Sequence, residues 1–235
     1  MRKMKMEVIA NGNTAEICEY GNNLICKLFY NRYPNLYVAH EFNNAKEIWS
    51  LGIKSPKPHE IISINGRSGI IYDKIIGEKL LDKIYSSEQE TWLNRFIKFQ
   101  KELFEFHDEN LLDYKEFLRL FASGSEELLL KIDELDSGNS VIHGDFHPSN
   151  LMVDRTGTLI LIDMMNVCKG SPAYDVARTC FLLRKDKDLQ KKYLEQSGYK
   201  IAEIKSYLEV ISLVREKELE AGNQRYTTRQ GDDLE

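Results

Sequence analysis

The chain has 235 residues, of which 42% are hydrophobic and 29% are charged, so it can form one large domain or two packed lobes. This composition excludes a collagen-like, low-complexity or strongly disordered chain. The 32 basic and 37 acidic residues give a formal net charge of -5, which argues against a surface that binds nucleic acid.

No segment indicates export or membrane insertion. The apolar runs fall far short of the roughly 18 residues that a transmembrane helix needs. No apolar stretch follows the basic start of the chain, as it would in a secretory signal. The four cysteines, Cys18, Cys26, Cys168 and Cys180, stand far apart without a C-x-x-C pair, as reduced structural thiols do. We expect a cytoplasmic protein with neither nucleic acid nor membrane as a partner, and the oligomeric state stays open.

The first 75 residues are predicted to be mainly strands. Turns of the Asn-Gly and Gly-Asn-Asn type break residues 7–30 into short apolar runs, which indicates an antiparallel meander. One helix is expected at about residues 36–51, where apolar residues recur at helical spacing and Gly52 then ends the helix. Two more strand-like runs flank a turn at Asn65-Gly66. We therefore predict an antiparallel-sheet N-terminal lobe over residues 1–75.

Residues 76–235 have a helical period and are predicted to form a second, mainly helical lobe. A helix of about twenty residues is expected after Ser87, because its apolar stripe continues to His107. Further helices are expected at 113–122, 125–135, 174–184, 187–196 and 201–221. The exception is the segment 141–166, where short β-rich runs surround a turn at residues 154–157. The fold class is thus α+β.

Chemistry-bearing residues concentrate within residues 143–150, directly after an apolar pair. Asp145 can offer a carboxylate to a substrate hydroxyl, and Asn150 can offer an amide oxygen to a hard cation. An apolar strand that ends thirteen residues after Asn150 supplies a second, anionic ligand, Asp163. Asn150 and Asp163 therefore predict a Mg²⁺ site.

Phosphoryl transfer from a nucleotide needs such metal ligands, an acid that faces the acceptor hydroxyl, and a lysine for the phosphates. Lys27 is the candidate lysine, because it lies on a predicted strand where an apolar residue would normally stand. A buried lysine needs an acidic partner. Glu41 on the following helix is the candidate partner, and Glu47 is the alternative.

The motif His143-Gly-Asp-Phe-His-Pro-Ser-Asn150, followed by Ile162-Asp163 and by Ser171-Pro-Ala-Tyr-Asp-Val-Ala177, resembles the signature of the aminoglycoside phosphotransferase and choline kinase-like family. Members are small-molecule kinases related in fold to protein kinases. The resemblance extends to the region around Lys27 and Glu41 and covers roughly residues 8–185. It implies a two-lobed protein-kinase-like fold, Mg²⁺ as cofactor, ATP or GTP as phosphate donor and a small-molecule acceptor.

The resemblance also implies roles for single residues. Asp145 would be the catalytic base, Asn150 and Asp163 would hold Mg²⁺, and Lys27, paired with Glu41, would contact the α- and β-phosphates.

Two backbone segments would bind the rest of the nucleotide. The loop with Gly12, Asn13 and Thr14 would cover the phosphates, and backbone groups from Asp73 to Ile75 would bind the purine.

This sequence departs from the family pattern after the metal-binding acid. Met164, Met165 and Asn166 follow Asp163, where an aromatic residue and an acid are common in the family, and Ser171 stands where an acid usually precedes Pro-Ala-Tyr-Asp. Asp175 matches an Asp of the family pattern and is expected to anchor the catalytic loop.

The acceptor is predicted from charge. Residues 1–75 hold ten bases and seven acids, whereas residues 76–235 hold 22 bases and 30 acids. An acidic second lobe favours a cationic acceptor such as an aminoglycoside or an amino alcohol, although the resemblance also covers kinases of uncharged sugars, homoserine and thiamine. Two alternatives to an active kinase stay open: a pseudokinase that binds nucleotide, and a metal-dependent hydrolase that uses His143, Asp145 and His147 as ligands. A kinase that acts on a protein is a third alternative, but no long activation segment follows Asp163, which favours a small molecule.

Overall fold

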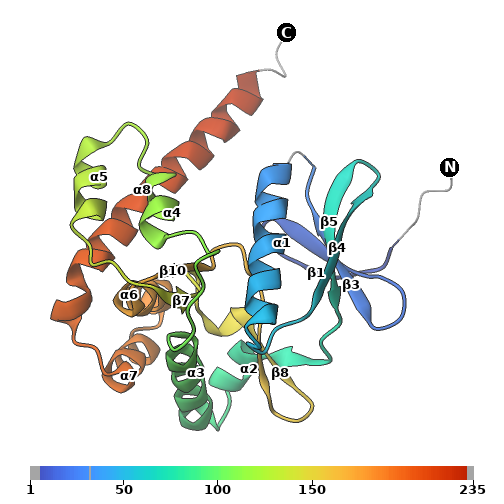
Figure 1. The fold of residues 1–235 in the computed structure, drawn as a ribbon, viewed down its shortest axis with the longest axis horizontal. Coiled ribbons are helices and arrows are strands. Elements are labelled where there is room, and N and C mark those ends of the chain that lie inside the picture. The colour runs from blue at the N-terminus through green and yellow to red at the C-terminus, as the bar shows by residue number, and fades with distance from the viewer. Residues whose placement is uncertain (1–5, 32, 232–235) are drawn as a thin grey trace. The chain divides into compact units, whose positions relative to one another are not determined.

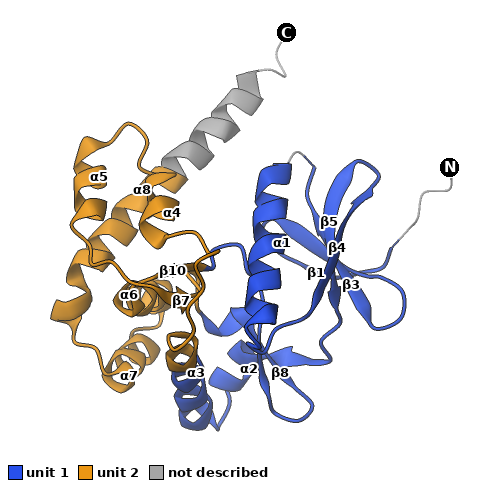
Figure 2. Cartoon of the chain, viewed as in Figure 1, with its two compact units in different colours: residues 1–99, 147–167 blue, residues 100–146, 168–235 orange. Residues whose placement is uncertain are grey.

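The computed structural model describes residues 6–31 and 33–231, with side chains as far as residue 218. Residues 1–5, which hold the basic start discussed above, lie outside the described part. The chain divides into two compact units, one formed by residues 1–99 and 147–167 and the other by residues 100–146 and 168–235 (Figure 2). The division into lobes at 1–75 and 76–235 stays a prediction.

The first unit is built on a five-stranded antiparallel sheet with the strand order β1-β2-β3-β5-β4 (Figure 1). The strands are β1 (Val8–Asn11), β2 (Ala15–Glu19), β3 (Leu24–Phe29), β4 (Pro58–Ile64) and β5 (Arg67–Asp73). The predicted turn between β4 and β5 is confirmed, because Asn65 and Gly66 have φ values of 51° and 80°, as a two-residue hairpin of type I′ requires.

The helix α1 (Asn35–Ser50) packs on β4 and β5, which confirms the predicted helix to within one residue. Its buried stripe has helical spacing and includes two polar side chains, Glu41 and Asn44, beside Val38, Ala45 and Ile48.

Strand β3 presents its two faces to different surroundings. Cys26 and Leu28 point into an apolar cluster with Cys18, Ile64 and Ile71. Because side chains alternate along a strand, Lys27 lies on the opposite face, where it meets α1.

The first unit also contains a three-stranded antiparallel sheet with the order β6-β8-β9. Its strands are β6 (Gly77–Lys79), β8 (Leu151–Asp154) and β9 (Leu159–Leu161), with a 3₁₀ turn at Pro148–Asn150 before β8 and the short helix α2 (Leu80–Ile84) after β6. The predicted turn between β8 and β9 is present, because the Asp154 carboxylate accepts hydrogen bonds from the backbone N–H groups of Thr156 and Thr158, both at 2.8 Å.

The second unit is mainly helical. Its elements are α4 (Tyr114–Arg119), α5 (Glu126–Asp133), β7 (Ser140–Ile142), β10 (Cys168–Gly170), α6 (Pro172–Leu182), a 3₁₀ turn at Leu183–Lys185, α7 (Lys187–Ser197) and α8 (Ile201–Gly231). β7 and β10 pair in antiparallel fashion, and α6 packs against α7, α8 and β7. All five helices predicted for this unit are present, although α4 and α5 are shorter and α8 is longer than expected.

The helix predicted after Ser87 is α3 (Gln89–Leu103), which has 15 residues and ends before the predicted end. His107 lies beyond it and forms a β-bridge with Ser140. The four cysteines are buried and free. None of the helices in the described residues is both long and apolar enough to cross a membrane.

Candidate active site

Lys27 joins two carboxylates from distant parts of the first unit. Its Nζ donates to Glu41 Oε1 at 2.7 Å and to Asp163 Oδ1 at 3.0 Å. The Lys27 side chain is 12% exposed and that of Glu41 only 1%, whereas that of Asp163 is 45% exposed. The structure therefore brings three of the predicted site residues together and makes Glu41, rather than Glu47, the partner of Lys27.

The charges at this centre depend on one another. Burial opposes the positive charge of Lys27, but the adjacent carboxylates of Glu41 and Asp163 outweigh that cost and raise its pKa. Burial raises the pKa of Glu41, although the charge of Lys27 acts in the opposite direction. Tyr72 also reaches this acid, with its hydroxyl 3.4 Å from Glu41 Oε1. Lys27 is thus held charged and aimed.

Asp163 has an unusual backbone. Its φ of 66° lies in the left-handed region, which a residue with a Cβ seldom adopts and which tends to occur at functional sites. The segment that follows is fixed by Asn44, whose Nδ2 donates to the carbonyl groups of Met164 at 2.9 Å and Val167 at 3.0 Å. The residues after Asp163, which depart from the family pattern, are therefore anchored to α1. We did not predict Asn44, although its position on the apolar stripe of α1 signals a buried polar group in need of partners.

Asn150 and Asp163 lie at the same end of the β8–β9 hairpin. The Ile162 N–H donates to the Asn150 carbonyl at 2.9 Å, one residue before Asp163. Asn150 is 7% exposed. One amide oxygen and one accessible carboxylate form the kind of hard-oxygen set that Mg²⁺ uses when nucleotide phosphates and water supply its other ligands. The residues present therefore fit that metal.

Asp145 belongs to the second unit and lies in the loop after β7. Arg178 Nη2 donates to Asp145 Oδ1 at 3.1 Å. The preceding Gly144 has a φ of 71°, and its N–H donates to Asp175 Oδ1 at 2.7 Å. Asp175 is fully buried, and burial raises its pKa against the hydrogen bond from Gln100. Asp175 thus holds the loop, as the resemblance implies.

Two contributors near this loop were not predicted. Arg178 stands one helical turn after Asp175, and this spacing could have indicated that both side chains face the same loop. Gln100 has no motif around it, and only the tertiary structure shows its contact.

The predicted phosphate loop is closed on itself at Gly12. The Gly12 N–H donates to the Ala15 carbonyl at 2.9 Å, and the Gly12 carbonyl accepts from the Tyr30 hydroxyl at 3.0 Å. The Thr14 carbonyl accepts from the Tyr30 N–H at 3.0 Å, and Asn13 lies in the bend between Gly12 and Thr14. Tyr30 therefore ties the loop to the end of β3.

The predicted purine-binding segment starts with groups that are already engaged. The N–H of Asp73 donates to the Lys57 carbonyl at 3.1 Å, and the N–H of Lys74 donates to the Asn23 carbonyl at 2.8 Å. The Asp73 carboxylate lies 2.7 Å from the His59 ring. Ile75 follows directly after these two residues.

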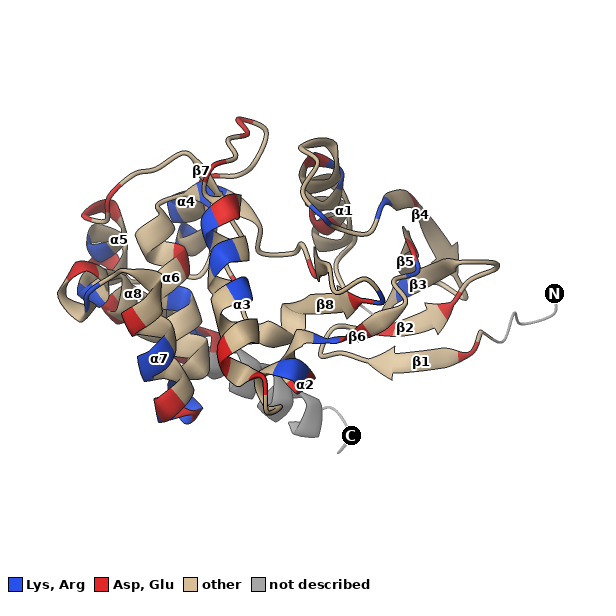
Figure 3. Ribbon diagram, turned by 90° about the horizontal axis from the view of Figure 1, so that it is seen from below, with Lys and Arg blue, Asp and Glu red and all other residues tan. Residues whose placement is uncertain are grey.

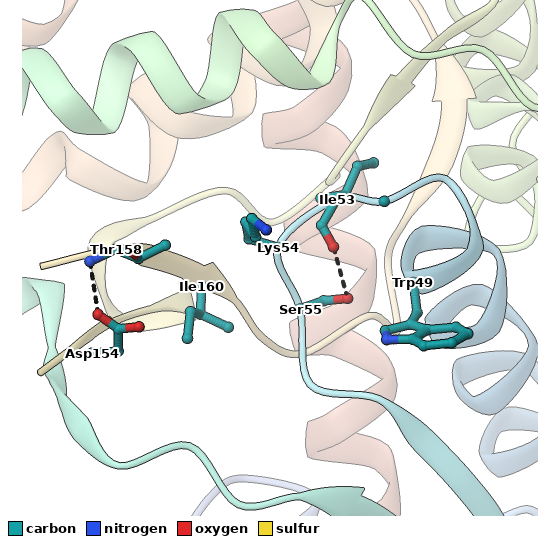
Figure 4. A pocket seen from close by; sticks show the side chains of 8 residues that line it. Trp49, Ile53, Lys54, Ser55, Asp154, Thr158 and Ile160 are labelled. Atoms are coloured by element: carbon teal, nitrogen blue, oxygen red, sulfur yellow. Dashed lines mark hydrogen bonds between the residues drawn. The ribbon is translucent and has the colours of Figure 1, made fainter. Parts of the chain in front are cut away.

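Two shallow pockets open on the first unit near the β8–β9 hairpin. The larger, of about 500 Å³, is lined by Trp49, Gly52, Ile53, Lys54, Ser55, Asp154, Thr158 and Ile160 (Figure 4). The smaller, of about 350 Å³, shares three of these residues and extends along residues 73–76. The smaller pocket includes Asp73 and Ile75, but neither pocket includes Lys27, Glu41 or Asp163.

Solved structures share this fold at low sequence identity. A thermostable mutant of aminoglycoside phosphotransferase APH(4)-Ia, in ternary complex with AMP-PNP and hygromycin B, is 14% identical with a TM-score of 0.70, covering 97% of this chain and 91% of that chain. APH(3'')-Id from Streptomyces rimosus, in complex with ADP and streptomycin, is 14% identical with a TM-score of 0.63, covering 85% and 90%. Choline kinase LicA from Streptococcus pneumoniae is 12% identical with a TM-score of 0.60, covering 99% and 87%.

These similarities confirm the predicted two-lobed kinase-like α+β fold. No curated protein sequence matches the chain. A family model matches residues 18–207, a range that contains the Lys27–Glu41 pair, the loop with Asp145 and Asn150, and Asp163. The chain belongs to the phosphotransferase enzyme family.

Proposed function

We propose that this protein is a Mg²⁺-dependent kinase that transfers the γ-phosphate of ATP or GTP to a hydroxyl group of a small molecule. The observation that carries the proposal is the contact of one lysine, Lys27, with both Glu41 and Asp163. Phosphoryl transfer uses such a lysine for the phosphates and such an acid for the metal. The complexes of related phosphotransferases with AMP-PNP and ADP support a nucleotide as the donor.

In this proposal each residue has a distinct task. Lys27, kept charged and oriented by Glu41, contacts the α- and β-phosphates, and Asn150 and Asp163 hold Mg²⁺. The metal, when bound, neutralises charge on the phosphates. Asp145 aligns the acceptor hydroxyl and takes its proton while the new O–P bond forms and the bond between the γ-phosphorus and the β-phosphate oxygen breaks.

Backbone groups bind both the purine and the phosphates of the nucleotide in this proposal. Because the N–H groups of Asp73 and Lys74 already donate to the carbonyl groups of Lys57 and Asn23, we propose that the purine is bound by the backbone at Ile75. The loop with Gly12, Asn13 and Thr14 covers the phosphates. Since the Gly12 N–H is already bonded to Ala15, Asn13 and Thr14 supply the amides of that loop.

The acceptor we propose is cationic, of the aminoglycoside or amino alcohol class. The excess of acids in residues 76–235 favours a cationic acceptor. Two of the structures with the same fold contain hygromycin B or streptomycin, and a third is a choline kinase, which supports the same class. The helices α3 and α7 each carry three basic and two acidic residues (Figure 3), so the net negative charge of residues 76–235 does not lie on these two helices. A cytoplasmic location stays a prediction.

The hydrolase alternative gains no support from side-chain placement. In the described part of the chain, no three His, Cys, Asp or Glu side chains gather in a group that could hold a metal ion. The pseudokinase alternative differs from our proposal only in turnover, so an experiment must separate them.

Phosphate transfer from labelled ATP and GTP is the test. The purified protein is incubated with Mg²⁺ and one of hygromycin B, streptomycin, choline, glucose, homoserine or thiamine, and mass spectrometry detects the gain of a phosphoryl group. We expect transfer to at least one hydroxylated amine. Asp145→Asn should reduce turnover roughly 100-fold or more while nucleotide affinity stays within twofold.

The control is Asp188→Asn, which removes an exposed carboxylate of α7 and should leave turnover unchanged. Nucleotide binding without transfer to any acceptor or to water would favour the pseudokinase. Equal loss of turnover and nucleotide affinity in Asp145→Asn would contradict the role of Asp145.

A further inference from the structure

We propose that Arg178 is a positioning residue that fixes the carboxylate of Asp145 for catalysis, an inference that rests on the proposed kinase function. The evidence lies within the second unit, where α6 faces the loop after β7. Arg178, on α6, contacts the proposed base itself, with Nη2 3.1 Å from Asp145 Oδ1.

Three residues of α6 hold three consecutive residues of this loop. Asp175 accepts from the Gly144 N–H at 2.7 Å, Arg178 Nε donates to the Gly144 carbonyl at 3.2 Å, and Thr179 donates to the Phe146 carbonyl at 2.8 Å. Residues at spacings of three and four share one face of a helix, so a single face of α6 makes all of these bonds. The backbone on both sides of Asp145 is therefore held by the same helix that holds its side chain.

The α6 side of this contact is fixed by buried hydrogen bonds. Gln100 Nε2 donates to Asp175 Oδ2 at 2.8 Å, and the Tyr193 hydroxyl donates to Gln100 Oε1 at 2.6 Å. Asp175, Thr179 and Gln100 are each at most 1% exposed. A network that is buried and satisfied is rigid, so α6 offers a firm support from which Arg178 can orient a partner.

The Asp145–Arg178 pair is more open than this support. The side chains are 24% and 17% exposed, respectively, and the Arg178 guanidinium lies 5.9 Å from the Phe181 ring. Arg178 uses Nε for the loop backbone and Nη2 for the Asp145 carboxylate, so its planar fork fixes both relative to each other. Lysine has a single donor atom and cannot reproduce this pair of directed bonds.

The consequence concerns turnover rather than nucleotide binding. An acceptor hydroxyl is aligned only as well as the carboxylate that receives its proton, and a displacement of about 1 Å can cost about 100-fold in rate. Removing Arg178 should thus lower kcat and leave the KM for the nucleotide unchanged.

A double-mutant cycle tests this inference. Phosphate transfer to an acceptor that the transfer assay identifies, or phosphate release from MgATP with water as the acceptor, is measured for wild type, Arg178→Gln, Asp145→Asn and the double variant. We expect Arg178→Gln to lower kcat roughly 10- to 100-fold, with nucleotide KM within twofold. In the Asp145→Asn background the same substitution should have less than about a threefold effect, because Arg178 acts through Asp145.

Two further variants serve as controls. Arg178→Lys keeps the charge and should recover only part of the lost kcat. Arg184→Gln removes the other arginine that lies over the Phe181 ring, at 3.9 Å, and should leave kcat unchanged. Full activity in Arg178→Gln, or an equal loss with and without Asp145, would overturn the inference while the kinase function stands.

Hydrogen exchange tests whether Arg178 holds the loop around Asp145, and it requires no measurement of activity. Peptides that cover residues 143–146 should exchange faster in Arg178→Gln than in wild type or Arg184→Gln, with the rest of α6 unchanged. Unchanged exchange there would overturn the inference. Failure of the proposed function has a different signature, namely absence of nucleotide binding and phosphate transfer in the wild type.

Discussion

Replacing Lys27 by methionine should destabilise the fold because it leaves Glu41 buried without its ion-pair partner. Glu41 is 1% exposed, its Oε2 atom has no hydrogen-bond partner, and the Tyr72 hydroxyl at 3.4 Å is a weak substitute for Lys27 at 2.7 Å. Breaking a buried ion pair by removing one partner costs about 3–5 kcal/mol. Asp163 is 45% exposed and loses little when Lys27 is removed.

We expect a loss of about 3 kcal/mol at pH 7.5, the lower end of that range, because Glu41 can take up a proton. For a chain of this size that loss lowers Tm by about 6–12 °C.

The loss should shrink at lower pH. Burial raises the pKa of Glu41 in the wild type, and Lys27 is the main group that opposes this rise. Without Lys27 the pKa of Glu41 in the folded state rises further above its value in the unfolded chain. Folding then takes up a proton, so the stability of Lys27→Met increases as the pH falls through that raised pKa. The gap to wild type should therefore be smaller at pH 5.5 than at pH 7.5.

Scanning calorimetry at both pH values measures the effect. Lys74→Met is the control, because Lys74 also forms an ion pair, with Glu19, but both side chains are about one-third exposed and the loss should stay below about 1 kcal/mol. The double variant Lys27→Met/Glu41→Gln should recover much of the lost stability, since it removes the stranded charge. An equal Tm deficit at both pH values with no recovery in the double variant would refute the reasoning.

Two further substitutions test how the first unit is held together. Asn44→Ala leaves the carbonyl groups of Met164 and Val167 without their donor and should cost about 2 kcal/mol in urea denaturation; it should also weaken nucleotide binding in calorimetric titration, whereas unchanged affinity would show that Asp163 does not depend on this anchor. Gly77→Ala places a Cβ 2.1 Å from the Val153 carbonyl oxygen, a backbone atom, so Tm should fall by several degrees, and an unchanged Tm would contradict the pairing of β6 with β8.

Part of the candidate site was predictable because short-range periodicity determines it. The period of two along β3 separates Lys27 from the apolar residues beside it in the sequence, and the helical period of α1 places Glu41 among buried positions. The turn at Asn65-Gly66 needs positive φ at both positions, and few sequences other than Asn-Gly favour this. These features require little knowledge of the rest of the chain.

The remaining features depend on distant segments. The contact between Lys27 and Asp163 joins residues 136 positions apart, and that between Asp145 and Arg178 joins residues 33 apart. β6 and α2 have three and five residues, too few to show a period, and β6 exists because it pairs with β8. The apolar stripe to His107 overstated α3, because the chain leaves the helix at Leu103 and His107 then pairs with Ser140.

The central claim is a Mg²⁺-nucleotide site at Lys27 and Asp163, and calorimetric titration tests it most directly. Wild type, Asp163→Asn and the Asp188→Asn control are titrated with a non-hydrolysable ATP analogue and its GTP counterpart, each with and without Mg²⁺. We predict that one or both analogues bind wild type and the control in a Mg²⁺-dependent manner, and that Asp163→Asn weakens this binding at least roughly 10-fold, because even loss of an outer-shell partner of a metal ligand costs that much. Absence of binding to the wild type, or an Asp163→Asn variant with the affinity and metal dependence of the wild type, would contradict the account.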